Sequence, residues 1–257
     1  MLSVDLNCDM GEGFGNYSIG NDRDIINYVS SVNIACGFHA GDPVIMDKTV
    51  KLALEKGVAI GAHPAFPDLL GFGRRNMIVS SDEAKAYVIY QVGALKAFVE
   101  ANGGELNHVK PHGALYNMAA SDYKLARAIA EAIYDIDSSL SLIGLANSKL
   151  IEAAAEVGIK GLNEVFADRA HSCDGTLVSR SIAGSVIHDV NQCYNRVLGM
   201  VKEGKIKSMY GKDIVVKADT ICIHGDNEMA LEFAKNINIK LKEEGISIKS
   251  INKGRRV

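Results

Sequence analysis

The stretch that decides the fold runs from Val32 to Pro64 and reads VNIACGFHAGDPVIMDKTVKLALEKGVAIGAHP. It begins with a short apolar run, passes through a polar loop, and then shows apolar residues three and four apart until a second apolar run. Asp42 followed by Pro43 is typical of a helix start, and Gly57 is typical of a helix end. The stretch therefore predicts a strand, a helix and a second strand joined as one unit.

Similar units repeat along the chain. Seven strand–helix units in series imply parallel strands joined by right-handed crossovers. We expect one α/β domain over residues 1–257 with about seven parallel strands, and a closed (β/α) barrel and an open doubly wound sheet both fit this pattern. Residues 246–251 add an eighth strand or form a tail. The candidate strands are Ser3–Asn7, Val32–Ala35, Val58–Gly61, His108–Val109, Leu140–Ile143, Gly161–Phe166 and Thr220–Ile223.

Capping residues predict further helix boundaries. Ser80 and Glu83 have the spacing of a capping box, in which each side chain binds the other residue's backbone N–H. Gly158 is expected to end a helix. Caps or spans of other helices are expected at Ser121, Asn147, Gly184–Val201 and Asp226.

Composition and charge give no sign of a polyanionic partner. With 47% hydrophobic and 23% charged residues the chain can bury a large core. A formal net charge of −3 gives no reason to expect nucleic acid or an anionic membrane. No apolar run reaches the roughly 20 residues that span a bilayer, and residues 1–7 do not resemble a signal peptide. The five cysteines are widely spaced without a CxxC pair, so we expect free thiols in a reducing, cytoplasmic setting.

Polar residues beside glycine follow almost every candidate strand. In parallel α/β folds the loops after the strands share one face, where ligands bind, so these clusters are expected to line a single cavity. The catalytic candidates are Asp9, Glu12, His39, His63, Lys110 and His112. The substrate-binding candidates are Asn7, Arg74, Arg75, Asp168, Arg169, His224 and Asp226.

Histidine is the most informative residue type in these loops. Four histidines follow candidate strands: His39, His63, His112 and His224. This placement is too regular for purely structural roles. In contrast, His108 and His188 lie within expected strands or helices and are expected to be structural. Imidazole and carboxylate suit Zn²⁺ and similar ions, so a metal site is a further hypothesis. Its candidate ligands are Asp9, His39 and His63.

Several familiar motifs are missing. The segment 199–205 imitates a phosphate-binding loop, but Ile206 stands where a hydroxyl must reach Mg²⁺. No GxGxxG, GxSxG or HExxH pattern occurs in the sequence. The long loop 65–79 ends near Arg74 and Arg75, which either hold a carboxylate or phosphate in a lid or lie exposed.

Seven motifs carry a resemblance to a known family. They lie at residues 5–15, 33–43, 61–75, 109–117, 164–169, 174–178 and 223–226. With these motifs, which extend from end to end, the chain resembles the LamB/YcsF family. One departure is Ser179 where proline is expected, which alters only local loop rigidity. The other is His171 where an aromatic residue is expected, and this one puts the detailed shape of that loop in doubt.

The resemblance implies a distorted (β/α) barrel of the glycoside hydrolase/deacetylase kind. It also implies ATP-dependent hydrolysis of 5-oxo-L-proline to L-glutamate, with Mg²⁺ accompanying ATP and with 5-oxoprolinase subunits B and C as partners. In that reaction Asp9 or Glu12 acts as general base, the strand-end histidines move protons or stabilise an oxyanion, and Lys110 neutralises phosphate oxygens. The substrate carboxylate is held by Arg74, Arg75 or Arg169.

Two other functions fit the same residues. The first is a stand-alone, metal-dependent amidase or deacetylase that works without ATP. The second is a non-catalytic assembly subunit, which has no need of converging histidines.

Overall fold

The chain closes into a ring of seven parallel strands. The structure, a computed structural model, describes residues 2–223 and 229–250. The ring order is β1-β2-β3-β4-β5-β6-β9, and β9 pairs back with β1. The predicted barrel is thus confirmed, and the open sheet is excluded because an open sheet leaves its two outermost strands unpaired. The ring strands are β1 (Ser3–Met10), β2 (Ser31–Ala35), β3 (Ala59–His63), β4 (Leu106–Val109), β5 (Ser141–Leu145), β6 (Lys160–Phe166) and β9 (Thr220–Ile223).

In the part of the chain that the structure describes, three short strands lie outside the ring. The strand β10 (Ser247–Ile248) pairs in parallel with the first residues of β1, so part of the predicted segment 246–251 is a strand. Strands β7 (Lys205–Lys207) and β8 (Asp213–Val215) form an antiparallel hairpin that the strand–helix alternation did not predict.

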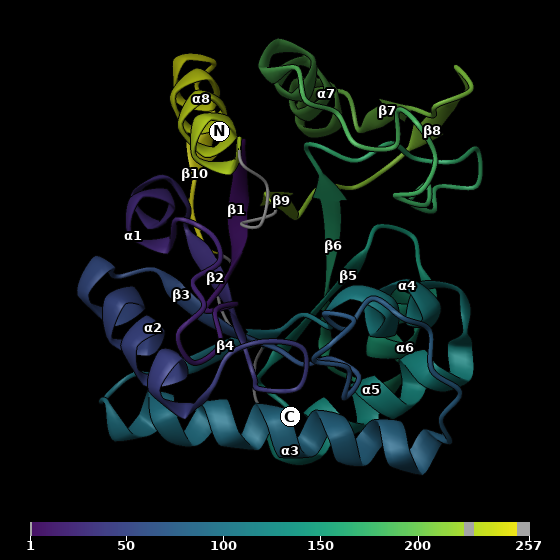
Figure 1. Cartoon of the computed structure of the whole chain (residues 1–257). Coiled ribbons are helices and arrows are strands. Elements are labelled where there is room, and N and C mark those ends of the chain that lie inside the picture. Colours follow the sequence, from purple (N-terminus) through teal and green to yellow (C-terminus); the bar gives the residue numbers. More distant parts are fainter. Residues whose placement is uncertain (1, 224–228, 251–257) are drawn as a thin grey trace.

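Helices cover the outside of the ring (Figure 1). The longest, α3, packs on α5, and α5 packs in turn on α6. Within residues 2–223 and 229–250, no helix is both long enough and apolar enough to cross a membrane. The helical segments are α1 (Asp22–Ile25), the 3₁₀ turn η1 (Ile26–Tyr28), α2 (Pro43–Lys56), α3 (Ser81–Ala101), α4 (Gly113–Ser121), α5 (Tyr123–Ile136), α6 (Lys149–Val157), α7 (Val190–Lys202) and α8 (Ala230–Glu243).

The predicted start and end of α2 and the predicted start of α3 are confirmed. The Asp42 carboxylate accepts hydrogen bonds from two backbone N–H groups in the first turn of α2, and Gly57 ends this helix with a φ of 66°. Ser80 and Glu83 form the predicted capping box at the start of α3. Gly158 ends α6 with a φ of 90°, as predicted. These signals succeed because each depends only on neighbouring residues.

Two predicted caps are displaced by one residue. Ser121 is the last residue of α4, and the carboxylate of Asp122 instead caps α5. The N-cap of α6 is Ser148 and not Asn147. A carboxylate accepts hydrogen bonds from two N–H groups at once, which favours Asp122 over its neighbour.

The start of α7 also lies later than predicted. Gly184 sits in a loop with a φ of 80°, and α7 begins at Val190, behind the side-chain cap of Asp189. The expected cap at Asp226 lies outside the described residues.

The inner face of the barrel is polar. Along β1, Asp5, Asn7 and Asp9 alternate with apolar residues that point toward the helices, as the two-residue period of a strand requires. The carboxylate of Asp5 accepts hydrogen bonds from the hydroxyls of Ser31 and Thr220. The strands are therefore joined inside the ring by hydrogen bonds and not only by packed aliphatic layers.

Gly61 on β3 makes room for an imidazole in this interior. The buried ring of His108 lies so close that a Cβ on Gly61 would come within 2.0 Å of its Nε2. The same nitrogen lies 2.8 Å from Oδ1 of Asn33 on β2. His108 is thus structural, as predicted.

Replacing Gly61 with alanine should therefore destabilise the barrel. We expect Gly61→Ala to cost about 1–3 kcal/mol, because the ring is enclosed and cannot move away without strain. The matched control is Gly93→Ala on the exposed face of α3, where an added Cβ meets nothing and helix propensity predicts a gain of up to about 1 kcal/mol. Urea unfolding of both variants measures the difference, and equal stability would contradict the role given to the His108 ring.

Candidate active site

Four side chains from four different strand ends meet at one end of the barrel. Glu12 follows β1, His39 follows β2, His63 ends β3 and His112 follows β4. All four are at least 95% buried. One ligand atom from each lies within 4.8 Å of the others, and we call these four residues the histidine cluster.

The contacts within the histidine cluster are short. His112 Nδ1 lies 3.0 Å from His63 Nε2. Glu12 Oε1 lies 3.2 Å from His39 Nε2 and 3.6 Å from His112 Nδ1. The rings of His39 and His112 stack with their centroids 3.8 Å apart.

Backbone carbonyls determine the tautomers of two of these histidines. His63 Nδ1 lies 2.7 Å from the carbonyl oxygen of Lys110, and His112 Nε2 lies 2.9 Å from that of Phe72. A carbonyl only accepts, so both of these nitrogens carry hydrogen. In the neutral rings His63 Nε2 and His112 Nδ1 are then unprotonated, and two lone pairs face each other. Such a contact calls for a proton or a cation between them.

Burial keeps part of the cluster uncharged. Burial lowers the pKa of His39 well below its usual range, and the nearby His63 lowers it further. The pKa of His112 is lowered in the same direction, first by burial and then by His39 and His63. Neutral imidazoles are the form that binds metal ions.

The histidine cluster could hold a divalent metal ion. A tetrahedral zinc ion with bonds of about 2.0–2.1 Å separates its ligand atoms by about 3.3 Å, which is close to the contacts above. His63 and His112 also have the backbone acceptors that usually orient metal-binding imidazoles. His39 lacks one, since its Nδ1 has no hydrogen-bond partner among the described residues. The best-supported ligands are therefore Glu12, His63 and His112.

A buried lysine lies beside the cluster. The ammonium of Lys110 contacts Asp9 Oδ1 at 2.9 Å, Glu164 Oε1 at 3.0 Å and Cys222 Sγ at 3.0 Å. Asp9 Oδ2 lies in turn 3.4 Å from His63 Nε2. Burial opposes the charged form of Lys110, but Asp9 and Glu164 outweigh it and raise its pKa well above the ordinary value. The lysine is therefore a fixed positive charge that holds Asp9 toward the histidine cluster.

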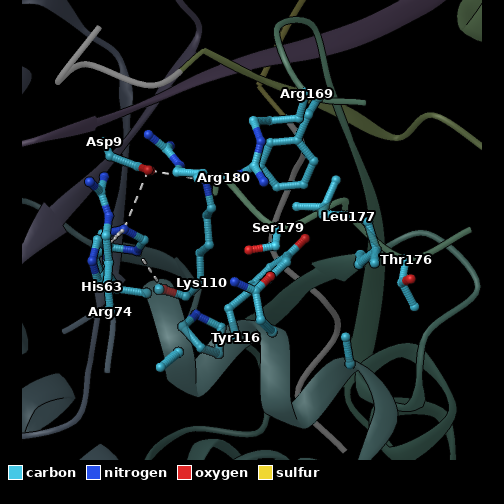
Figure 2. A pocket seen from close by; sticks show the side chains of 18 of the residues that line it. Asp9, His63, Arg74, Lys110, Tyr116, Arg169, Thr176, Leu177, Ser179 and Arg180 are labelled. Carbon is cyan, nitrogen blue, oxygen red and sulfur yellow. Dashed lines mark hydrogen bonds and ion pairs between the residues drawn. The ribbon is translucent and has the colours of Figure 1, made fainter. Parts of the chain in front are cut away.

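A cavity of about 400 Å³ opens beside these groups (Figure 2). One side presents Asp9, Lys110 and three members of the histidine cluster, Glu12, His63 and His112. Arg169 and Arg180 contribute positive charge from the segment between β6 and α7. The apolar part of the wall consists of Ala114, Ala120, Leu145, Phe166, Leu177 and the ring of Tyr116. This combination suits a small anion with an apolar body.

Gly73 brings the loop between β3 and α3 onto the histidine cluster. Its φ is 64°, and a Cβ there would lie 2.8 Å from His39 Cβ and 2.9 Å from His112 Cδ2. The neighbouring Phe72 supplies the carbonyl that orients His112. Arg74 follows, lines the cavity, and places its guanidinium carbon 4.9 Å from the centre of the Phe72 ring.

The comparison with known proteins decides the family. The model of the LamB/YcsF family matches residues 4–256. This chain belongs to the LamB/YcsF family. It is 57% identical to the A subunit of 5-oxoprolinase from Alkaliphilus metalliredigens over 98% of each chain, and 55% identical to that of Bacillus subtilis over 99% of each. The lactam utilization protein of Thermus thermophilus is 45% identical, with a TM-score of 0.92 over 97% of this chain and 100% of that one.

The barrel brings together most of the predicted site residues of this LamB/YcsF chain. Its structure puts all six catalytic candidates in or beside the histidine cluster, and the cavity is also lined by Arg74 and Arg169. The predicted metal set of Asp9, His39 and His63 differs from the observed cluster, in which Glu12 and His112 join the two histidines.

Three substrate-binding candidates do not line the cavity. Asn7 lies inside the barrel and donates to Glu164 and Thr220. Arg75 is paired with Asp68 in the same loop, and Asp168 is buried outside the lining. His224 and Asp226 lie outside the described residues.

Several lining or adjacent residues were missing from the predicted site, and four of them bear on its chemistry. Glu164, Tyr116 and Arg180 lay within or beside the family motifs, but nothing in their spacing distinguished them from structural residues. Cys222 was expected only as a free thiol, and the structure confirms a buried free thiol. Burial raises its pKa well above the ordinary value, so the sulfur stays protonated.

Titration with Zn²⁺ or Mn²⁺ tests the histidine cluster directly. We expect one site per chain, with affinity at least tenfold weaker in His63→Ala and in His112→Ala, because each loses a donor already oriented by a carbonyl. The control is His171→Ala, which removes a buried imidazole outside the cluster. Calorimetry measures the affinities, and unchanged binding in His112→Ala would show that this cluster holds no metal ion.

Proposed function

We propose that this chain is the A subunit of an ATP-dependent 5-oxoprolinase. Working in the cytoplasm with subunits B and C, it hydrolyses 5-oxo-L-proline to L-glutamate while ATP, accompanied by Mg²⁺, is cleaved. The observation that carries the proposal is the pair of facing lone pairs on His63 and His112, set beside the Asp9–Lys110 pair in an anion-binding cavity. The names of relatives at 55–57% identity support the substrate. We treat residues 1–257 as one domain.

The cavity suits a small cyclic amide acid. A five-membered lactam presents an apolar ring edge to Leu145 and Phe166, and its carboxylate can pair with Arg169. Burial lowers the pKa of Arg169 to about 10, and the charge of Arg180 acts in the same direction. Its guanidinium is still charged at neutral pH, so it is the strongest candidate for the carboxylate contact.

The histidines provide the proton transfers for ring opening. Because His63 Nδ1–H is fixed on a carbonyl, its Nε2 is free to take a proton from an attacking water. Asp9, at 3.4 Å from that nitrogen, stabilises the resulting imidazolium. The same proton can pass to the lactam nitrogen as the C–N bond breaks, which prevents expulsion of an unstable amide anion.

ATP makes the lactam carbon a better electrophile. Transfer of the γ-phosphoryl group to the lactam oxygen gives an imidate that water attacks more readily than an amide. Breaking the C–N bond then leaves an acyl phosphate, and a second water releases phosphate to give glutamate. A divalent ion held by Glu12, His63 and His112 would occupy His63 Nε2 and would supply Lewis-acid stabilisation of negative charge on oxygen. With such an ion bound, Asp9 would take the proton from water in place of His63.

A metal-dependent amidase or deacetylase that works without ATP is the second candidate. The observation that favours it is the donor set of the histidine cluster, which matches zinc chemistry. A role in assembly without catalysis is a weaker candidate, since a scaffold has no use for facing lone pairs in a cavity.

Replacing His63 and His112 together with alanine should abolish glutamate release in the reconstituted complex. We expect a loss of at least 10³-fold, because the proton carrier and its partner are both removed. The control is His188→Ala, which changes an exposed histidine and should leave activity within twofold.

The same assay separates the candidate functions. Glutamate release that needs ATP and all three subunits supports the proposal. Release by this chain alone, insensitive to ATP and lost on chelation, would replace it with the amidase. Full activity in the double variant would leave assembly without catalysis as the remaining function.

A further inference from the structure

Glu164 lies within the barrel, in contact with Lys110. It belongs to β6 and is fully buried. Its Oε1 accepts hydrogen bonds from Lys110 Nζ and from Asn7 Nδ2, both at 3.0 Å. A buried carboxylate is costly unless it is paired, so this position needs a specific reason for an ionised residue.

That reason is the geometry of the lysine. An ammonium has three protons, and Lys110 directs contacts to Asp9, Glu164 and Cys222. Asp9 and Glu164 thus hold the ammonium between two negative charges. Without Glu164, Asp9 would be the carboxylate that remains in contact with the ammonium, and the two groups could move together. Asp9 would then no longer be held at one position beside His63.

The second oxygen of Glu164 points to a link with the cavity. Glu164 Oε2 is buried and has no hydrogen-bond partner among the described residues, and the same holds for the hydroxyl of Tyr116. The two groups approach each other without well-formed hydrogen-bond geometry: the pKa of Tyr116 is raised well above its ordinary value, first by burial and then by the charge of Glu164 and the contact of the hydroxyl with that carboxylate. A small movement of the Tyr116 ring would let its hydroxyl donate a hydrogen bond to Glu164 Oε2.

Tyr116 is also part of the cavity wall. Its ring packs edge-on against Phe166 with centroids 5.9 Å apart, and both rings line the cavity. Figure 2 labels Tyr116 and Lys110 among the side chains that line the cavity. The phenol therefore stands between the space for the ligand and the buried carboxylate.

We infer that Glu164 is a positioning residue for the ring opening proposed above: it holds the Lys110 ammonium against Asp9, and the Tyr116 hydroxyl connects it to the cavity wall. This inference rests on the proposed function. Glu164 touches neither the substrate nor the histidine cluster, so it acts only through Lys110 and Asp9.

The first test is Glu164→Gln in the reconstituted complex. The amide keeps the size of the side chain and can still accept from Lys110 and Asn7, while its N–H group can face the Tyr116 oxygen. We expect kcat to fall about 10–100-fold with KM changed less than threefold, because misplacing a catalytic group by about 1 Å can cost that much without weakening substrate binding. The control is Ser141→Ala, which removes another buried, unpartnered hydroxyl on a barrel strand and should be silent.

The link to the cavity wall is tested by Tyr116→Phe. This variant loses a hydroxyl that makes no well-formed hydrogen bond among residues 2–223 and 229–250, so its melting temperature should not fall, while kcat should fall by less than in Glu164→Gln. The double variant should be no slower than Glu164→Gln alone, because both changes act through one carboxylate. Additive losses would overturn the link, and a kcat within twofold in Glu164→Gln would overturn the positioning role.

A readout that needs no activity separates this inference from the proposed function. Acetylation of the purified chain, followed by peptide mass spectrometry, reports how firmly each lysine is held. Lys110 should react several-fold faster in Glu164→Gln than in the unmodified sequence, whereas the exposed Lys51 should react equally in both. Faster labelling in a complex that opens no lactam would reject the proposed function but keep the positioning role. Equal labelling would reject the positioning role whatever the complex does.

Discussion

The ammonium of Lys110, held inside the barrel between Asp9 and Glu164, is the interaction on which the active site depends. A barrel interior normally fills with branched aliphatic side chains, but this one contains ionised groups from β1 and β6 around a lysine that follows β4. Removing either carboxylate would leave an imperfectly compensated charge, which typically costs several kcal/mol when buried. The lysine thus ties distant strands together and fixes the carboxylate beside the histidines.

Backbone groups control the rest of the site. The carbonyls of Lys110 and Phe72 set the tautomers of His63 and His112, so their lone pairs face inward without any charged orienting residue. The carbonyl of Phe72 reaches His112 because Gly73 allows the loop to turn directly above the imidazoles. The conformation of this loop and the orientation of the imidazoles therefore depend on each other. A side chain at Gly73 would displace the loop and the neighbouring imidazole rings.

Sequence patterns predicted parallel strands alternating with helices and the end of the sheet that carries the chemistry, and the family resemblance predicted closure into a barrel. The strand–helix alternation and the polar end of the sheet could be predicted because they depend only on residues close in sequence. Examples are the helix caps at Asp42 and Ser80 and the polar residues that follow each strand. Contacts between side chains far apart in the sequence could not be predicted from it. The sequence could not distinguish Arg74, which lines the cavity, from Arg75, which pairs with Asp68, because the two are adjacent and chemically identical. Nor could it show that Glu164, on a strand rather than after one, contacts Lys110.

Closure of the ring by β9 has a consequence for how the protein is made. Thr220 on β9 hydrogen-bonds Asp5 on β1 across 215 residues of sequence, and Cys222 completes the surroundings of Lys110. During translation the first six ring strands emerge before β9, so the buried carboxylates remain hydrated until β9 has been synthesised. Contacts of such long range slow folding. The surroundings of Lys110 are therefore completed only after β9 joins β1, and the substrate cavity cannot form before that step.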